Sequence, residues 1–163
     1  SVQTVRRYLE HLETTYQVLF LRPFSRNLTS AVVKAPKLYW TDIGLLRQGT
    51  GKWGPLDGSL FETLVVVEIH KWCDTLGLDV RQSFYRTRSG LEVDLILETA
   101  SGVLGVEEKS SPAVSSADLR GLRSLGAALG ERWRGGIVVY RGRELRTAGE
   151  SGNIWAVPVH RLL

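Results

Sequence analysis

Two segments with the alternating polarity of β-strands, joined by a short turn at residues 99–102, constrain the fold of this chain more than any other feature. Alternation is the signature of a strand, because successive side chains point to opposite faces of the sheet. In the first segment Glu92 and Asp94 share one face. In the second, Glu107 and Lys109 share a face and Glu108 points to the other. The pattern predicts two neighbouring antiparallel strands that carry acidic side chains.

The carboxylates of Asp94 and Glu107, with twelve residues between them in the sequence, are expected to meet where a divalent ion would bridge them. Hard cations take oxygen ligands, and phosphodiester cleavage uses a metal-activated water and a cation near the developing charge. Lys109 would supply that second cation. The spacing therefore predicts a metal-dependent nuclease centre that uses Mg²⁺ or Mn²⁺. The alternative is a solvated hairpin face, since charged residues alternate on many exposed hairpins.

A helix predicted from Gly58 to Leu76 adds a third acidic residue to this group. Asp57 or Ser59 is the expected N-cap, after the break at Pro55 and Leu56. Glu62 lies in the early turns and is the candidate third metal ligand. Glu68 is six residues further on, hence about 120° away around the helix axis. We interpret Glu68 as a paired carboxylate within an apolar stripe.

The order of these residues resembles the PD-(D/E)xK nuclease superfamily, and within it the archaeal Holliday junction resolvase pattern. The resemblance rests on Gly58-Ser59-x-x-Glu62 in a helix, Asp94 in a strand and Glu107-x-Lys109 in the next strand. Segments 34–45, 60–62 and 85–94 are similar to the uncharacterised C-terminal domain found behind AAA-plus ATPase modules in bacterial and archaeal proteins. That similarity covers nearly the whole chain.

The resemblance implies an α/β fold with a PD-(D/E)xK nuclease-like central mixed sheet flanked by helices. It implies that Glu62, Asp94 and Glu107 bind Mg²⁺ or Mn²⁺, and that Lys109 positions the nucleophile or stabilises the charge on the reacting phosphate. The implied partners are DNA and an N-terminal ATPase domain of the same parent chain. The family usually carries an apolar residue at position 108, so Glu108 needs a partner, an edge position or protonation.

The chain is expected to divide into a connecting segment, residues 1–50, and a nuclease-like domain, residues 51–163. The first segment begins with an amphipathic helix, Thr4 to Glu13, and a strand, Tyr16 to Leu21. This pair looks like the remnant of a winged helix. The sequence contains no methionine, and we expect it to be part of a longer protein. A second copy of the chain, in a homo-oligomer, or its long loops would then cover the apolar stripe formed by Val5, Tyr8 and Leu12.

The net positive charge of the chain lies in its first third. Residues 1–50 hold seven basic and three acidic residues, and the fourteen basic and fourteen acidic residues of the remainder cancel. Phosphate contacts supply most non-specific nucleic-acid affinity, so this distribution predicts DNA binding. Arg6 and Arg7 on the first helix, and Arg86 and Arg88 before Asp94, are the candidate contacts. The alternative is that a charge of this size serves only solubility.

Several classes of protein are excluded by the sequence. A single cysteine, Cys73, rules out an internal disulfide and zinc-site spacing. No apolar run approaches the roughly 20 residues of a membrane span, and no signal peptide is present, which predicts a cytoplasmic location and no membrane partner. The Gly-rich loop at residues 49–54 has Leu46 and Trp53 where a Walker motif requires Gly and Ser or Thr. Any ATP hydrolysis is therefore expected elsewhere in the parent protein.

The resulting functional prediction is a magnesium-dependent deoxyribonuclease, an endonuclease-like domain that recognises DNA structure rather than sequence. The alternative is a catalytically inactive module of the same fold that docks the ATPase onto DNA or onto a protein partner.

Overall fold

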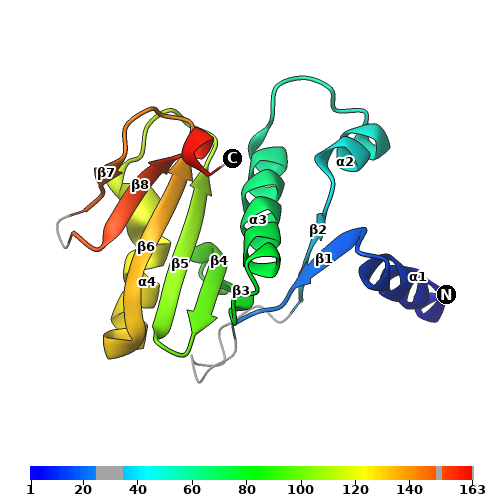
Figure 1. The fold of residues 1–163 in the computed structure, drawn as a ribbon, viewed down its shortest axis with the longest axis horizontal. Coiled ribbons are helices and arrows are strands. Elements are labelled where there is room, and N and C mark those ends of the chain that lie inside the picture. The colour runs from blue at the N-terminus through cyan, green and yellow to red at the C-terminus, as the bar shows by residue number, and fades with distance from the viewer. Residues whose placement is uncertain (25–34, 150–151, 163) are drawn as a thin grey trace.

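A six-stranded mixed sheet forms the centre of the computed structural model, which describes residues 1–24, 35–149 and 152–162 (Figure 1). The strand order is β3-β4-β5-β6-β8-β7. Strands β3, β4 and β5 are antiparallel, β5, β6 and β8 are parallel, and β7 runs antiparallel to β8. The strands are β3 (Arg81–Arg86), β4 (Glu92–Thr99), β5 (Gly102–Lys109), β6 (Trp133–Tyr140), β7 (Arg146–Thr147) and β8 (Ile154–Pro158).

Helices cover both faces of the sheet, as Figure 1 shows for α3 and α4. Helix α3 (Gly58–Thr75) begins at its predicted cap, because the Asp57 side chain accepts a hydrogen bond from the Leu60 backbone. Helix α4 (Arg120–Leu129) follows a short 3₁₀ turn, η1 (Ser116–Leu119), and connects β5 to the parallel strand β6. The α/β fold with a mixed sheet flanked by helices is therefore confirmed.

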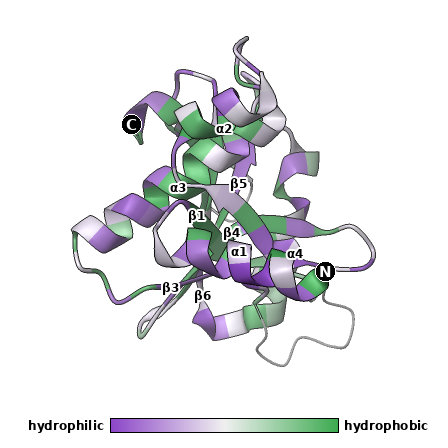
Figure 2. Ribbon diagram, turned by 90° about the vertical axis from the view of Figure 1, so that its right-hand side faces the viewer, coloured by the Kyte–Doolittle hydropathy of each residue, from purple (hydrophilic) through white to green (hydrophobic). Residues whose placement is uncertain are grey.

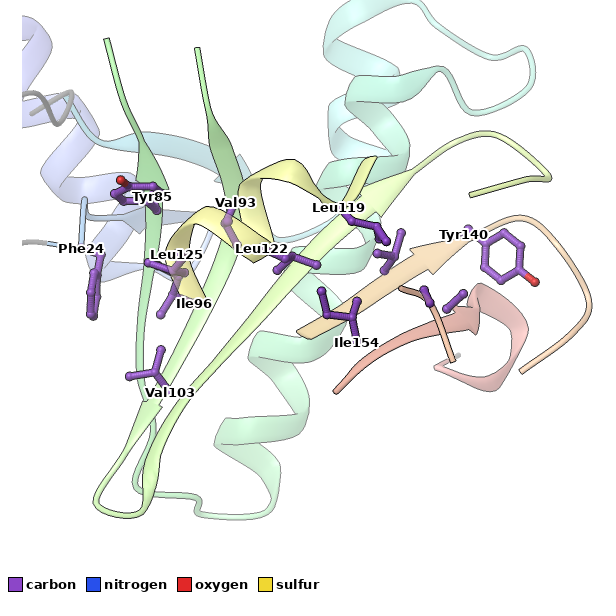
Figure 3. Packing of buried hydrophobic residues seen from close by; sticks show 13 residues of the cluster. Phe24, Tyr85, Val93, Ile96, Val103, Leu119, Leu122, Leu125, Tyr140 and Ile154 are labelled. Carbon is purple, nitrogen blue, oxygen red and sulfur yellow. The ribbon is translucent and has the colours of Figure 1, made fainter. Parts of the chain in front are cut away.

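Each helix packs on its own hydrophobic cluster. Beneath α4, the side chains of Leu122 and Leu125 meet Val93, Ile96 and residues of the parallel strands (Figure 3). On the opposite face, α3 packs on a second cluster that contains Phe61, Val65, Val66, Leu95, Val106 and Val139. A Cβ atom on Gly121 would collide with the carbonyl oxygen of Glu92. Glycine therefore lets α4 approach the start of β4, where the acidic residues of the sheet lie.

The N-terminal segment is attached to the outer side of α3. It consists of α1 (Val2–Thr14), a two-stranded antiparallel sheet of β1 (Val18–Leu21) and β2 (Lys37–Trp40), and α2 (Ile43–Thr50). Leu21 and Tyr39 are buried in the same cluster as the apolar face of α3. The Phe24 amide donates to the Phe84 carbonyl at 2.7 Å, so the chain after β1 is also hydrogen-bonded to the edge strand β3. This attachment fixes β2 against α3.

Helix α1 has no buried residue; of the predicted apolar stripe, Val5 is 58% and Tyr8 67% exposed, while Leu12 is half-buried. The side of the molecule that carries α1 and α2 faces the viewer in Figure 2. Within the described ranges no loop covers these side chains, so the expectation that the long loops would cover them is not met there. None of the described helices has the length and apolar character needed to cross a membrane.

Candidate functional site

The four residues predicted to form the site all line one hollow of about 400 Å³. Glu62 comes from the second turn of α3, Asp94 from the start of β4, and Glu107 and Lys109 from the end of β5. Because β4 and β5 are antiparallel, the start of one strand lies beside the end of the other. Helix α3 then adds Glu62 above this end of the sheet. The structure thus brings together all of the predicted catalytic residues.

Asp94 lies where β4 and β5 stop pairing. The last matched pair at this end is Leu95 with Val106, and beyond it the Glu108 amide donates to Asp94 Oδ2 at 3.2 Å. A side-chain carboxylate therefore takes the place of a ladder carbonyl. Asp94 is 7% exposed and Glu107 is 8% exposed, so both carboxylates are held out of water.

Glu107 is kept from ionising by its surroundings. Burial and the neighbouring charge of Asp94 raise the pKa of Glu107 to about 8. The Lys109 ammonium donates to Glu107 Oε1 at 3.0 Å and opposes this rise. Oε2 of Glu107 is buried without a hydrogen-bond partner among the described residues. One oxygen of this carboxylate therefore remains open to a further ligand.

Glu108 lies in the site, which corrects the expectation that it points away from it. Its side chain does alternate with that of Glu107, but the hollow is bounded on that side by Glu62 of α3, and Glu108 lines it too. Burial, followed by the charges of Asp94 and Glu62, raises the pKa of Glu108 to about 7. Its Oε2 is also buried without a partner in the described part of the chain. Of the three alternatives expected for Glu108, a partner, an edge position or protonation, the raised pKa favours protonation up to neutral pH.

Lys37, at the start of β2, is the main site residue that the sequence analysis missed. Its ammonium lies 2.6 Å from Glu92 Oε1, 2.8 Å from Glu62 Oε1 and 3.2 Å from Asp94 Oδ1. Two residues along the same strand, the Tyr39 hydroxyl donates to Glu62 Oε1 at 2.6 Å. The spacing Lys37-x-Tyr39 puts both side chains on one face of a strand. This alternation indicates that the two side chains lie together, but it does not show which element the strand packs against.

The electrostatics of this cluster favour a charged lysine and a neutral tyrosine. Burial by itself would lower the pKa of Lys37, but the surrounding groups, led by Asp94, raise it well above its ordinary value. Burial and the charge of Glu62 raise the pKa of Tyr39. For Asp94, burial raises the pKa and the Lys37 ammonium opposes the rise. Lys37 therefore remains an ammonium cation among the carboxylates.

The candidate DNA-binding arginines divide into two groups. The Arg86 side chain lies 3.6 Å from Oε2 of Glu92, a residue that lines the hollow, and Arg88 is exposed in the turn before β4. Arg6 and Arg7 on α1 line other depressions, beyond α3 from the sheet, and do not contribute to the hollow (Figure 1). Arg120, at the start of α4, lines the hollow instead. Two of the basic residues counted in the first third, Arg26 and Lys34, lie outside the described residues.

The residues of the hollow suit a hard divalent cation only after some movement. Among the described residues, no three His, Cys, Asp or Glu side chains are placed to hold a metal ion as they stand. The donors are nevertheless all carboxylate oxygens, which Mg²⁺ and Mn²⁺ prefer. The buried Oε2 atoms of Glu107 and Glu108 have no hydrogen-bond partner there. The donor set therefore fits the ion, while the ammonium of Lys37 lies among three other carboxylates of the hollow, those of Glu62, Glu92 and Asp94.

The fold and the hollow define an α/β domain with buried carboxylates where the central strands β4 and β5 stop pairing. The chain belongs to the family described as a domain of unknown function, DUF4143, which matches residues 57–162. A second domain of unknown function, DUF8612, matches residues 1–52. No curated protein matches the chain. Glu62, Asp94, Glu107 and Lys109 lie within the first match, whereas Lys37 and Tyr39 lie within the second.

Proposed function

We propose that this chain is a metal-dependent DNA endonuclease domain and forms the C-terminal part of a larger AAA-plus ATPase. The observation that carries the proposal is the convergence of Glu62, Asp94, Glu107 and Lys109 in one hollow. Two of these carboxylates are buried side by side, and the charge of Asp94 raises the pKa of Glu107. Such an arrangement is costly to the fold unless a cation relieves it, and perturbed carboxylates of this kind gather at functional sites.

The site residues would divide the work as follows. A bound Mg²⁺ or Mn²⁺ would supply Lewis-acid activation of the phosphate and of the attacking water. Asp94 and Glu107 would hold the ion, and Glu62 would complete the ligand set or orient the water. Lys109, which pairs with Glu107 at 3.0 Å, would stabilise the charge that develops on the phosphate.

DNA would approach the hollow along its basic rim. Arg120 lines the hollow, Arg86 pairs with Glu92 of its lining, and Arg88 lies in the turn before β4, so these arginines would contact phosphates near the scissile bond. Arginine suits this role because its planar guanidinium binds phosphate oxygens in pairs. These contacts carry no base information, which agrees with a substrate recognised by its structure. Arg6 and Arg7 would contact only a more distant part of the nucleic acid.

The second candidate function, an inactive module that docks an ATPase onto DNA or a protein, is favoured by Lys37. An ammonium that contacts Glu62, Glu92 and Asp94 at once can balance their charge without any metal. A domain that had lost its catalytic ion would be stabilised by such a lysine. The two candidates therefore differ in whether a divalent ion binds.

Titration of the domain with Mg²⁺ and Mn²⁺ separates these functions. We expect saturating metal to raise the free energy of unfolding by about 2.7 kcal/mol at a hundredfold excess over the Kd, and branched duplex DNA to be cleaved. Asp94→Asn should abolish both effects, and Lys109→Ala should keep metal binding but lose cleavage. Glu131→Gln, an exposed acid outside the hollow, is the matched control. If metal changes neither stability nor DNA, the docking module is the correct description.

A further inference from the structure

Three acidic side chains that line the hollow surround a positive charge supplied by the chain itself, the ammonium of Lys37. The Lys37 ammonium forms ion pairs with three carboxylates at distances between 2.6 and 3.2 Å. The ammonium donates hydrogen bonds to Glu62 and Asp94 and forms an ion pair with Glu92. The side chain is only 18% exposed, and the contacts come from α3 and from two positions of β4. Convergence of this kind from separate elements is what a metal site requires of its ligands.

Lys109 and Lys37 contact different carboxylates of the hollow. Lys109 pairs with one carboxylate, that of Glu107, at 3.0 Å. Lys37 lies among Glu62, Glu92 and Asp94, two of which are proposed ligands of the ion. A divalent cation that bound both Glu62 and Asp94 would therefore lie within contact distance of the Lys37 ammonium. Two cations so close in a buried site repel strongly, so the ion and the present Lys37 contact exclude each other.

We infer that Lys37 holds the place of a divalent cation between Glu62 and Asp94, and that the ion binds there by displacing its ammonium. This inference rests on the proposed function for the identity of the ion and adds a competitor built into the chain. The lysine stem is flexible enough to move without a change in the backbone. Glu92, which lies at the shortest distance from the ammonium, 2.6 Å, would retain it after displacement.

Tyr39 keeps Glu62 in place during this exchange. Its hydroxyl donates to Glu62 Oε1 at 2.6 Å, and Tyr39 itself is buried against α3. Glu62 therefore does not lose all of its partners when Lys37 moves, and its second oxygen remains available to the ion. Lys37 and Tyr39 act together from one strand: the first blocks the cation position and the second orients a ligand of it.

The inference predicts that removing the charge of Lys37 strengthens metal binding. We expect Lys37→Met to bind Mn²⁺ at least tenfold more tightly than the unmodified chain in calorimetric titration. Lys37→Arg, which keeps the charge, should remain as weak as the unmodified chain. Lys52→Met is the control, because Lys52 also pairs with an acid, Asp57, but at an exposed position away from the hollow. Equal or weaker Mn²⁺ binding by Lys37→Met would overturn the inference and make Lys37 a support of the ligands.

If the Lys37→Met variant does not fold, a second variant, Lys37→Gln, tests the same inference. Lys37→Gln retains an N–H donor for Glu62 or Asp94 without the charge, and the same tenfold gain is expected. DNA cleavage is scored separately in the unmodified chain. Cleavage without any gain in Mn²⁺ affinity for Lys37→Met and Lys37→Gln would refute the role of Lys37 alone. A gain in affinity without cleavage of any DNA by any variant would refute the nuclease proposal alone.

Discussion

Replacement of Glu107 by glutamine should stabilise the metal-free protein at alkaline pH and have little effect at acid pH. Glu107 is 8% exposed, and burial together with Asp94 raises its pKa to about 8. In the unfolded chain the same carboxyl titrates near 4.5. The folded state therefore binds the proton more tightly than the unfolded state does. Stability associated with Glu107 is complete below about pH 4.5 and is lost as the pH rises through 8.

The size of the effect follows from these two pKa values. Each pKa unit corresponds to about 1.4 kcal/mol, so ionisation of Glu107 in the folded protein costs at most about 5 kcal/mol of stability. Asp94 titrates together with Glu107, and small movements admit water, both of which reduce the cost. We expect about 2 to 3 kcal/mol for Glu107→Gln at pH 9. Glutamine can still accept the hydrogen bond from Lys109, so the geometry of this contact is retained.

Urea unfolding followed by tryptophan fluorescence measures this difference. The experiment compares the unmodified chain and Glu107→Gln in EDTA at pH 5 and at pH 9, with Glu131→Gln as the exposed control. The gain should be present at pH 9 and absent at pH 5, and the control should show neither. Failure of Glu107→Gln to exceed the unmodified chain in stability at pH 9 would refute the reasoning. It would mean that the Lys109 pair outweighs burial and repulsion by Asp94.

Three further perturbations test the packing and the site. Gly121→Ala should lower the free energy of unfolding, measured in urea, by about 1 to 3 kcal/mol, because its Cβ would displace α4 from β4. Gly49→Ala is the control: a Cβ at Gly49 meets open space, so this change should be neutral or stabilise by up to about 1 kcal/mol. Tyr39→Phe removes the 2.6 Å hydrogen bond to Glu62 and should cost about 1 kcal/mol in the same assay. Arg88→Ala should reduce the salt dependence of duplex DNA affinity by about one phosphate contact, measured by fluorescence anisotropy.

The central part of the fold could be predicted from the sequence because its signals are local. Alternating polarity gave the two strands that carry Asp94 and Glu107, and the Asp57 cap gave the start of α3. The near-continuous apolar run from Gly136 to Tyr140 is typical of a buried strand, and β6, which contains it, is parallel to β5 and is reached through α4. Two antiparallel strands with these residues at adjoining ends leave little freedom in where the carboxylates meet.

The remaining site residues could not be predicted because they depend on contacts between distant elements. Strand β2 is only four residues long, and its packing on α3 is fixed by Tyr39 in a cluster drawn from the whole chain. Alternation correctly separated Glu107 from Glu108, but it cannot show that β4 and β5 stop pairing beside a hollow that both side chains line. Likewise, net charge indicated a basic first third without showing that Arg6 and Arg7 lie away from the hollow.

The site joins the two segments that match separate families. Glu62 and Asp94 lie within residues 57–162, and the ammonium that balances them comes from residues 1–52. Buried carboxylates without a counter-ion are strongly destabilising. In the absence of a divalent ion, the C-terminal segment therefore depends on Lys37 for the charge balance of its own hollow. Displacement of β2 would remove the Lys37 ammonium and so favour cation binding, and a bound cation would in turn make the Lys37 contacts dispensable. If the proposed ion binds, the position of the N-terminal segment and the occupancy of the site would therefore be thermodynamically linked.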